Sequence, residues 1–581
     1  DPCPAGERGP RSPTFPAMES APAPRLSALP RGVLATVLLV TLIPVAYMLF
    51  RTAGAVRDVA YWDEIDTVLE FLLRYTAAPD AYERLKVLFS LNNEHRMATS
   101  RALLVLSHAL TGTVNLAVLG AIGVGFVVGL AGLLVATAGD AWRRALLALL
   151  LGGLLFQLQH FENFFWPGSS LDHFLVVTLA AAVFVALARR SRTGLAVAAA
   201  AGTAATFTLA QGLLVWPVAA ALLALQGRRR DLAVWGSCAV FAIGCFFTGF
   251  TTNAAHAATE ISGAGLFRVA GFWLQALGAP VALGNATLAP LLGAALLAIL
   301  ASQLRPAIIA REPVALPLAL WAAGSLLLIS LGRLEVVKGH VHSRYYILSC
   351  LTWGLVLFVQ LGLWRDPARP ARLLWRAAAG IVTFNVAANL VAAHDARSWI
   401  ICRDSAMERF VEHGRDGQGP FFLHPVPAYT DLMVRRAEEA GVYRMPSLSR
   451  PARHGGAKPG VDIAYFIDRI PVTPEQVRIE GWAALPGTTA RPGDVRVILQ
   501  SAKSRLVFTA APQPRPDVAA VHTAQSWRDS GFRFQLRRSL LPREDFQIGF
   551  LLPTPRGPEF VMTAHRVDLT GEGRGVLAGA P

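Results

Sequence analysis

The sequence predicts a mainly α-helical, polytopic integral membrane protein of about 11 transmembrane helices, followed by a C-terminal extracytoplasmic β-sandwich domain. Of its 581 residues, 53% are hydrophobic and only 16% are charged, whereas a soluble chain carries about 25% charged residues. The mean hydropathy is +0.43, and apolar runs long enough to cross a bilayer recur through most of the chain. Five cysteines are too few to hold together a chain of this length, which excludes a disulfide-rich fold.

The charge of the chain follows a topological pattern. The net charge is +15, with 54 basic and 39 acidic residues, and in a soluble protein this would suggest nucleic-acid binding. Here the arginines lie in short clusters between apolar runs, where cytoplasmic loops carry them. We therefore expect no nucleic-acid partner and assign to the cytoplasm the clusters at 143–144, 189–192, 228–230, 305–311 and 365–376.

Residues 1–32 are rich in Pro, Gly and Arg. They predict a disordered cytoplasmic leader, or a start assigned too early, because Met18 can open the chain. The run 33–50 resembles a signal peptide in that Ala53-Gly54-Ala55 follows it. Its 18 residues exceed the usual signal core, so we favour an uncleaved first membrane helix.

Eleven apolar runs predict a transmembrane domain over residues 33–393. If these runs alternate in direction, every basic cluster falls on one side and the tail falls on the other. The further run 267–283 has no basic connector and predicts a re-entrant or interfacial helix on the outer side. The eleven runs are 33–50, 113–138, 145–158, 172–188, 194–209, 211–226, 232–250, 286–303, 314–331, 346–364 and 375–393.

The composition also indicates which segments lie outside the membrane. Composition changes sharply after the last run, which predicts a helical connector over 394–460. Short alternating segments separated by Pro and Gly then predict the β-sandwich over 461–581; examples are Val477–Trp482, Asp494–Leu499, Gly531–Leu536 and Phe546–Leu552. The stretches between runs that are assigned to the outer side are 51–100, 159–172, 251–285 and 332–345.

The first outer stretch contains the segment 61–66, Tyr-Trp-Asp-Glu-Ile-Asp. Its spacing predicts a helix on the membrane surface whose carboxylates face a cavity or water. A merely solvated acidic face is the alternative. The apolar side of the helix would hold Trp62, Ile65, Leu69 and Leu72, and the acidic side Asp63, Asp66 and Glu70.

The chain resembles the GT-C glycosyltransferases in three features. It has a Trp-Asp-Glu cluster about a dozen residues after the first membrane helix, it has many membrane helices, and it ends in an outward soluble tail. The GT-C enzymes include protein mannosyltransferases, aminoarabinose transferases and mycobacterial arabinosyltransferases. The resemblance implies that Asp63 is the general base toward an acceptor hydroxyl or amine, with Glu64 as second choice. The chain is also similar to uncharacterised bacterial polytopic proteins with Asn-Glu-His-Arg and Glu-Asn-x-x-Trp segments, here 93–96 and 162–166.

The resemblance also implies the substrates and the location. The donor would be a sugar linked to a polyprenyl phosphate, and the acceptor an envelope glycan, a lipid or a protein. The site would face outward from a bacterial cytoplasmic membrane, with the N-terminus in the cytoplasm and membrane lipids around the helices.

The outer stretch before the tenth run supplies candidates for binding the donor phosphate. In an extended conformation Lys338, His340, His342 and Arg344 share one face and form a basic ribbon. Contact with lipid headgroups is the alternative. Glu335 is the only acidic residue close to this His pair in sequence, so we assign no metal ligand and no cofactor, and leave a divalent cation open.

Polar and aromatic side chains in the other outer stretches are expected to line the substrate cavity. Ionisable groups at membrane depth are costly, which favours a functional role, although aromatics there also serve as interfacial anchors. Helix capping and salt bridging explain the segment 92–96 equally well; in the functional interpretation Arg96 binds phosphate. The residues assigned to the substrate are Trp62, Glu94, His95, His160, Glu162, Asn163, Trp166 and Tyr345.

The function predicted from these observations is a membrane glycosyltransferase. One alternative is an oligosaccharide ligase that depends on the basic ribbon more than on Asp63. Another is a non-catalytic flippase or transporter of lipid-linked glycans, although the sequence contains no paired repeats. A third is a scaffold whose tail binds carbohydrate; there Trp482 either packs in the core or is exposed to bind sugar.

Overall fold

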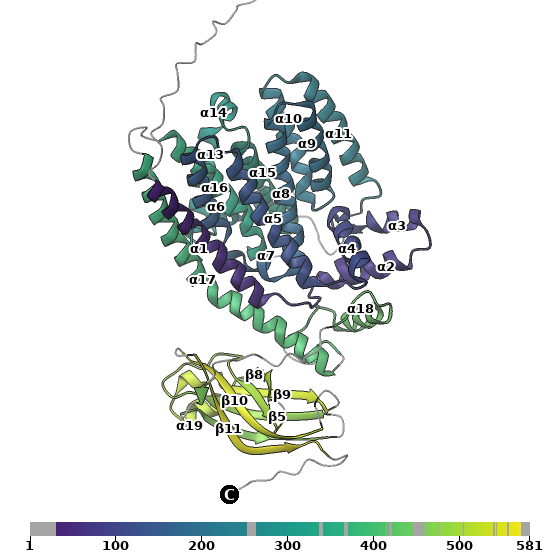
Figure 1. Ribbon diagram of the computed structural model, residues 1–581, viewed down its shortest axis with the longest axis vertical. Helices are drawn as coiled ribbons and strands as arrows, with labels where there is room; N and C mark the ends of the chain where they lie inside the picture. Colours follow the sequence, from purple (N-terminus) through teal and green to yellow (C-terminus); the bar gives the residue numbers. More distant parts are fainter. Residues whose placement is uncertain are drawn as a thin grey trace, which may run out of the picture.

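The computed structural model is mainly helical, with a strand-rich region at its C-terminal end (Figure 1). Lys338, His340 and nearly all of the predicted leader lie outside the described residues. The structure describes residues 31–251, 263–335, 341–364, 370–413, 415–417, 421–445, 458–459, 462–473, 476–502, 505–538, 541, 543–554 and 557–570.

Seven helices in the described ranges are long and apolar enough to cross a membrane, or eight if a bent pair forms one span. The chain is thus a multi-pass membrane protein by helix length and composition. The bent pair joins α6 (Ala141–Leu155) to η2 (Leu158–His160) and α7 (Phe161–Phe165). The seven are α1 (Arg31–Ala55), α5 (Leu116–Thr137), α8 (Pro167–Ala188), α11 (Arg229–Phe247), α15 (Ala315–Arg333), α16 (Tyr346–Leu363) and α17 (Pro370–His413).

The predicted count of 11 spans is not confirmed. Three of the predicted runs form helices below the 18 residues required of a span; they are α9 (Arg192–Thr206), α10 (Val215–Leu225, preceded by η3, Ala210–Leu214) and α13 (Leu288–Gln303). The apolar run alone does not report where a helix breaks, and here the breaks shorten the helices.

Polar side chains set where several helices begin. Asn115 accepts the Val118 N–H at 3.0 Å before α5, and Asp140 accepts the Arg143 N–H at 2.8 Å before α6. Such N-caps satisfy amide groups that have no partner within the helix. They therefore fix the starting points of helices whose apolar sequences have no sharp boundary.

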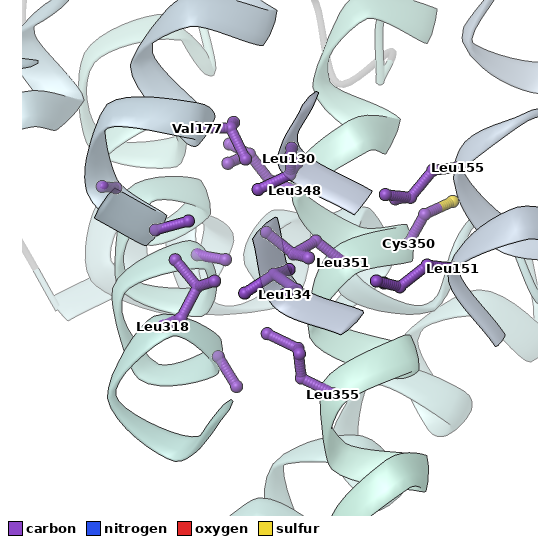
Figure 2. Packing of buried hydrophobic residues seen from close by; sticks show 14 of the residues in the cluster. Leu130, Leu134, Leu151, Leu155, Val177, Leu318, Leu348, Cys350, Leu351 and Leu355 are labelled. Atoms are coloured by element: carbon purple, nitrogen blue, oxygen red, sulfur yellow. The ribbon is translucent and has the colours of Figure 1, made fainter. Parts of the chain in front are cut away.

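The bundle core is built from leucine-rich faces. Figure 2 shows these side chains converging from α5, α6, α8, α15 and α16. Small residues let neighbouring helices approach closely: a Cβ on Gly123 of α5 would lie 2.5 Å from the Ser170 carbonyl carbon of α8. The core residues labelled there are Leu130, Leu134, Leu151, Leu155, Val177, Leu318, Leu348, Cys350, Leu351 and Leu355.

Helix α12 (Gly263–Gly278) covers most of the run predicted to be re-entrant or interfacial. It packs against α13 so closely that a Cβ on Gly293 would overlap the Leu274 carbonyl oxygen. It also contacts α15, where the Trp273 indole N–H donates to the Ala323 carbonyl oxygen at 2.8 Å. α12 is part of the packed bundle, and its predicted membrane depth stays a prediction.

Two of the basic connectors, those of Arg143 and Arg228, lie at one end of the bundle. Arg143 at the start of α6 pairs with Glu312 at 2.6 Å, just after the short helix α14 (Pro306–Arg311). Arg228, between α10 and α11, donates to the Leu187 carbonyl oxygen near the end of α8 at 2.8 Å. These contacts bring Arg143 close to the 305–311 connector and Arg228 close to the end of α8. The grouping of all five clusters on one side, and its cytoplasmic location, stay predictions.

The opposite end carries the first outer stretch and α18 (Pro427–Glu439), with the strand-rich region beyond it (Figure 1). The stretch begins with a π-helix, η1 (Ile65–Glu70). Ile65, Leu69 and Leu72, three residues of the predicted apolar side, are buried in the protein; the helix's predicted place on the membrane surface stays a prediction. Trp62 is 38% exposed with φ +49°, because it lies in the turn before the helix. The other elements are α2 (Phe71–Ala77), α3 (Ala81–Leu88), β1 (Leu91–Asn92), β2 (His95–Arg96) and α4 (Ala98–Thr111).

The strand-rich region contains two sheets that share one apolar cluster. All four strands predicted there are present, and pairing is antiparallel apart from β3 with β11. Trp482 is 8% exposed and packs on Trp527, 5.9 Å between ring centroids. One sheet is β4 (Ala464–Arg469), β5 (Gln476–Ala484), β9 (Gly531–Arg537) and β8 (Ala511–Gln513); the other is β3 (Lys458–Pro459), β11 (Gly557–Asp568), β10 (Asp545–Thr554), β6 (Arg496–Gln500) and β7 (Arg505–Thr509). Short helices α19 (Pro516–Val521) and η5 (Gln525–Trp527) lie between β8 and β9.

Helix α17 joins the bundle to this region. It runs without a break for 44 residues, through the boundary predicted at residue 393. In its C-terminal half Arg397 pairs with Asp494 at 2.5 Å, and Thr509 donates to Glu408 at 2.5 Å. The last membrane helix thus continues into the first part of the predicted connector and ends at His413, before the separate helix α18.

Candidate active site

The site forms around an ion pair between distant segments of the chain. Arg344 Nη1 lies 3.4 Å from Asp63 Oδ2, although 281 residues separate them. The Asp63 side chain is 58% exposed and that of Arg344 is 21% exposed. A carboxylate is therefore presented to solvent beside a guanidinium that is largely buried.

The second outer loop fixes the position of Arg344, which lies in η4 (Ser343–Tyr345). Glu162 Oε2 accepts hydrogen bonds from the Arg344 amide at 3.0 Å and from the Ser343 hydroxyl at 2.8 Å. Asn163 donates to the Arg344 carbonyl oxygen at 2.8 Å. Two of the predicted site residues, Glu162 and Asn163, thus hold a third in place.

Aromatic rings surround the guanidinium. Arg344 lies 5.5 Å from the ring centroids of both Trp166 and Tyr345, which attracts the cation to the ring faces. The Tyr345 ring also contacts His342 and His173, at 6.2 and 6.0 Å between centroids. Nε of Arg344 is buried without a hydrogen-bond partner among the described residues.

Glu64, the second candidate base, lies beneath the surface. It is 1% exposed, and its two oxygens accept the Gly168 amide at 2.6 Å and the Tyr61 amide at 2.9 Å. Burial raises the pKa of Glu64 to about 8, against the opposing effect of these hydrogen bonds. Glu64 joins the first outer stretch to the start of α8, whereas Asp63 faces solvent.

The β1–β2 hairpin brings a second charged pair to this end of the bundle. Glu94 pairs with Arg333 at the end of α15. His95 Nδ1 accepts the Ala210 amide at 3.1 Å, so the neutral ring carries its proton on Nε2. Burial lowers the pKa of His95 to about 4, an effect that Arg333 and Arg344 reinforce and Glu94 opposes. His95 is therefore a neutral group whose ring feels the charges of both Arg333 and Arg344.

A segment that the sequence did not indicate covers the acidic face of η1. The Leu423 carbonyl oxygen accepts the Trp62 amide at 2.6 Å. His424 Nε2 lies 3.6 Å from Asp66, and Tyr429 donates to Glu70 at 2.6 Å. Burial is also the main cause that raises the pKa of Asp66. No local pattern links residues 421–445 to the first outer stretch.

Arg333 and Arg403 were also missed by sequence reasoning. Arg403 is 2% exposed and donates to the carbonyl oxygens of Phe165 at 3.0 Å and Ala55 at 2.6 Å. Both arginines end or interrupt apolar helices. An arginine at a position that should be apolar was the available signal.

Two predicted residues make other contacts. The Arg96 guanidinium donates to the carbonyl oxygens of Phe246 at 2.6 Å, Phe89 at 2.5 Å and Thr248, which holds the end of α11. His160 is fully buried, and its ring lies 5.4 Å from that of Phe164. Neither is joined by a described contact to the Asp63–Arg344 pair.

A cavity of about 10 Å³, the space that one water molecule needs, lies among η1, α4, α5 and the start of α8. Its polar lining includes Thr67, Ser100, Arg101 and Asp172. Thr67 donates to the Asp63 carbonyl oxygen at 2.7 Å, and Asp172 Oδ1 is buried without a hydrogen bond among the described residues. The polar environment therefore extends from Asp63 into the bundle.

Within the described part of the chain, no group of three or more His, Cys, Asp or Glu side chains is arranged to hold a metal ion. The arrangement at Asp63 and Arg344 instead offers a base, a cation and aromatic faces. No family model, curated protein or solved structure matches the chain.

Proposed function

We propose that the protein is a membrane glycosyltransferase that moves a sugar from a polyprenyl-phosphate donor to an acceptor on the extracytoplasmic face. The observation that carries this proposal is the contact between the Asp63 carboxylate and the Arg344 guanidinium. It joins a solvent-facing base to a buried cation at the end of the bundle opposite the basic connectors. A donor anchored in the bilayer suits a site at the end of membrane helices.

In the proposed reaction, Asp63 takes the proton from the acceptor hydroxyl as the acceptor oxygen bonds to the anomeric carbon. The bond between that carbon and the donor phosphate oxygen breaks, and the polyprenyl phosphate leaves with the electron pair. Arg344, whose side chain is 21% exposed, stabilises the departing phosphate through its positive charge.

The proposal includes a location and a domain assignment. We place the protein in a bacterial cytoplasmic membrane, with the basic connectors in the cytoplasm and the C-terminal region outside. The two sheets of that region, which share one apolar cluster, would form the β-sandwich. Arg333 would join Arg344 in binding phosphate, because Glu94 holds it at the same end of the bundle.

The test is sugar transfer by purified protein in nanodiscs with a panel of radiolabelled polyprenyl-phosphate sugars. Asp63→Asn and Arg344→Ala are each expected to reduce turnover at least 100-fold, as loss of a general base or of a charge-stabilising donor does. Asp545→Asn is the matched control, because it breaks an exposed Asp–Arg pair of 2.6 Å in the strand-rich region. Wild-type turnover by Asp63→Asn would refute the role of the base.

Two other outcomes would replace the proposal. Turnover only with oligosaccharides on a polyprenyl diphosphate, insensitive to Asp63→Asn, would identify an oligosaccharide ligase. Movement of the lipid-linked sugar across the bilayer without release would identify a flippase.

A further inference from the structure

A strained tryptophan lies next to the exposed carboxylate. Trp62 has φ +49°, a left-handed conformation that bulky residues rarely adopt. Its amide donates to the Leu423 carbonyl oxygen at 2.6 Å, which holds the turn in this conformation. Strain of this kind is typical of positions where a side chain must point in one direction.

The strained turn places the indole beside a second exposed ring. The rings of Trp62 and Phe422 are 6.3 Å apart between centroids and inclined by 30°. Each side chain is 38% exposed, although large aromatic side chains are usually buried. The two residues are 360 positions apart in sequence, so the docking of residues 421–445 creates this aromatic surface.

The surroundings of the two rings are polar and acidic. Asp63 follows Trp62 directly and is 58% exposed. Asp66 and His424 lie 3.6 Å apart on the same two segments, and the Tyr429 hydroxyl bonds to Glu70. Carboxylates at this density oppose insertion of the rings into an anionic lipid surface. They also provide acceptors for hydroxyl and ammonium groups.

We propose that Trp62 and Phe422 form the acceptor subsite, where a pyranose ring of a neutral or amino-bearing glycan stacks beside Asp63. The C–H edges of a pyranose carry partial positive charge and pack on the negative face of an aromatic ring. The hydroxyl groups at its rim then reach the carboxylates of η1. Uronic acids are excluded by repulsion from Asp63 and Asp66. This inference rests on the proposed sugar transfer and names its acceptor as a saccharide.

The test is calorimetric titration of the full chain in nanodiscs with chitopentaose, mannopentaose and maltopentaose, and with pentagalacturonate as the acidic probe. At least one neutral glycan is expected to bind, and pentagalacturonate is not. Trp62→Ala and Phe422→Ala should each weaken binding about tenfold, which corresponds to ~1.4 kcal/mol. Phe466→Ala is the matched control, because it removes a 59% exposed ring from β4.

Two further variants separate stacking from misfolding. Trp62→Phe keeps an aromatic face and should retain most of the affinity. Trp62→Asn removes the ring with a residue that tolerates positive φ, and it should lose as much affinity as Trp62→Ala. Wild-type affinity in Trp62→Asn and Phe422→Ala, binding of none of the neutral glycans, or preference for pentagalacturonate would overturn the subsite.

The result also distinguishes this inference from the proposed function. Asp63→Asn should still bind the glycan while losing transfer. Glycan binding that requires Trp62, without turnover from any donor, would refute the transferase and retain the subsite. Turnover that requires Asp63, with an acceptor KM unaffected by Trp62→Asn, would retain the transferase and refute the subsite.

Discussion

Replacing Glu64 by glutamine is expected to change how the local unfolding of the first outer stretch depends on pH. In the closed form Glu64 is buried, and in the open form it is exposed to water. Burial raises the pKa of Glu64 from 4.5 to about 8. Below pH 4.5 the carboxyl is protonated in both the closed and the open form. Between pH 4.5 and pH 8 only the open form loses the proton, so the opening free energy falls by about 1.4 kcal/mol per pH unit, roughly 5 kcal/mol in all.

Glutamine does not ionise, so this dependence is absent from Glu64→Gln. Its amide keeps one acceptor oxygen, but its NH₂ group then faces one of the two backbone amides that now donate to Glu64. That mismatch costs about 1–3 kcal/mol at every pH. The variant should be less protected than the wild type at pH 5 and more protected at pH 8.5, and the two curves should cross near roughly pH 6.

Hydrogen exchange of peptides covering residues 58–77, measured on protein in nanodiscs, provides the assay. Comparing variant and wild type at equal pH removes the chemical pH dependence of exchange itself. Glu83→Gln is the control, because Glu83 is a 39% exposed glutamate of the same stretch, paired with Lys86. A protection ratio between Glu64→Gln and wild type that stays constant from pH 5 to pH 8.5 would refute the reasoning.

Two further predictions concern helix packing and topology. Gly293→Ala should destabilise the protein by about 1–3 kcal/mol, because the added methyl group overlaps the facing backbone at the α12–α13 contact. Gly271→Ala is the control: its added methyl group meets nothing within 4 Å, so the thermal unfolding temperature should stay unchanged or rise. Equal effects of the two substitutions on that temperature would contradict the packing. In a chain without native cysteines, a membrane-impermeant maleimide should label Val521→Cys, 80% exposed, in intact cells and leave Arg230→Cys unlabelled; the opposite result would invert the proposed topology.

Local patterns predicted the local features of the fold. The segment Val477–Trp482, predicted as a strand, is seen as β5 (Gln476–Ala484), whose burial alternates over 476–479 and is continuous after that. The runs of apolar residues likewise mark the helices of the bundle. Where these helices begin depends on caps such as that of Asp140 with the Arg143 amide. The count of 11 spans is not confirmed, because an apolar run does not report where a helix breaks and some of the runs form helices shorter than 18 residues.

In the site, too, the local sequence predicted single residues, whereas their contacts depend on segments distant in sequence. Asp63, Glu162 and Arg344 are each recognisable in sequence as charges in outer loops, yet their contact depends on the fold of the whole bundle. The role of Glu64 depends on its burial, which the adjacent Asp63 does not share. The covering segment around His424 carries no local sign of its partner Asp66.

Helix α17 has a consequence for how this molecule can be divided. At about 1.5 Å per residue, its 44 residues extend roughly 66 Å, about twice the ~30 Å of a bilayer core. Arg403, in the distal part, bonds to the loop that carries Glu162 and to the end of α1. The chain of α17 therefore does not break at the predicted end of the membrane domain, residue 393. A shortened protein that ends at residue 393 would lose Arg403 and with it the hydrogen bond that holds the loop carrying Glu162. The membrane portion and the strand-rich region should therefore be expressed and purified together.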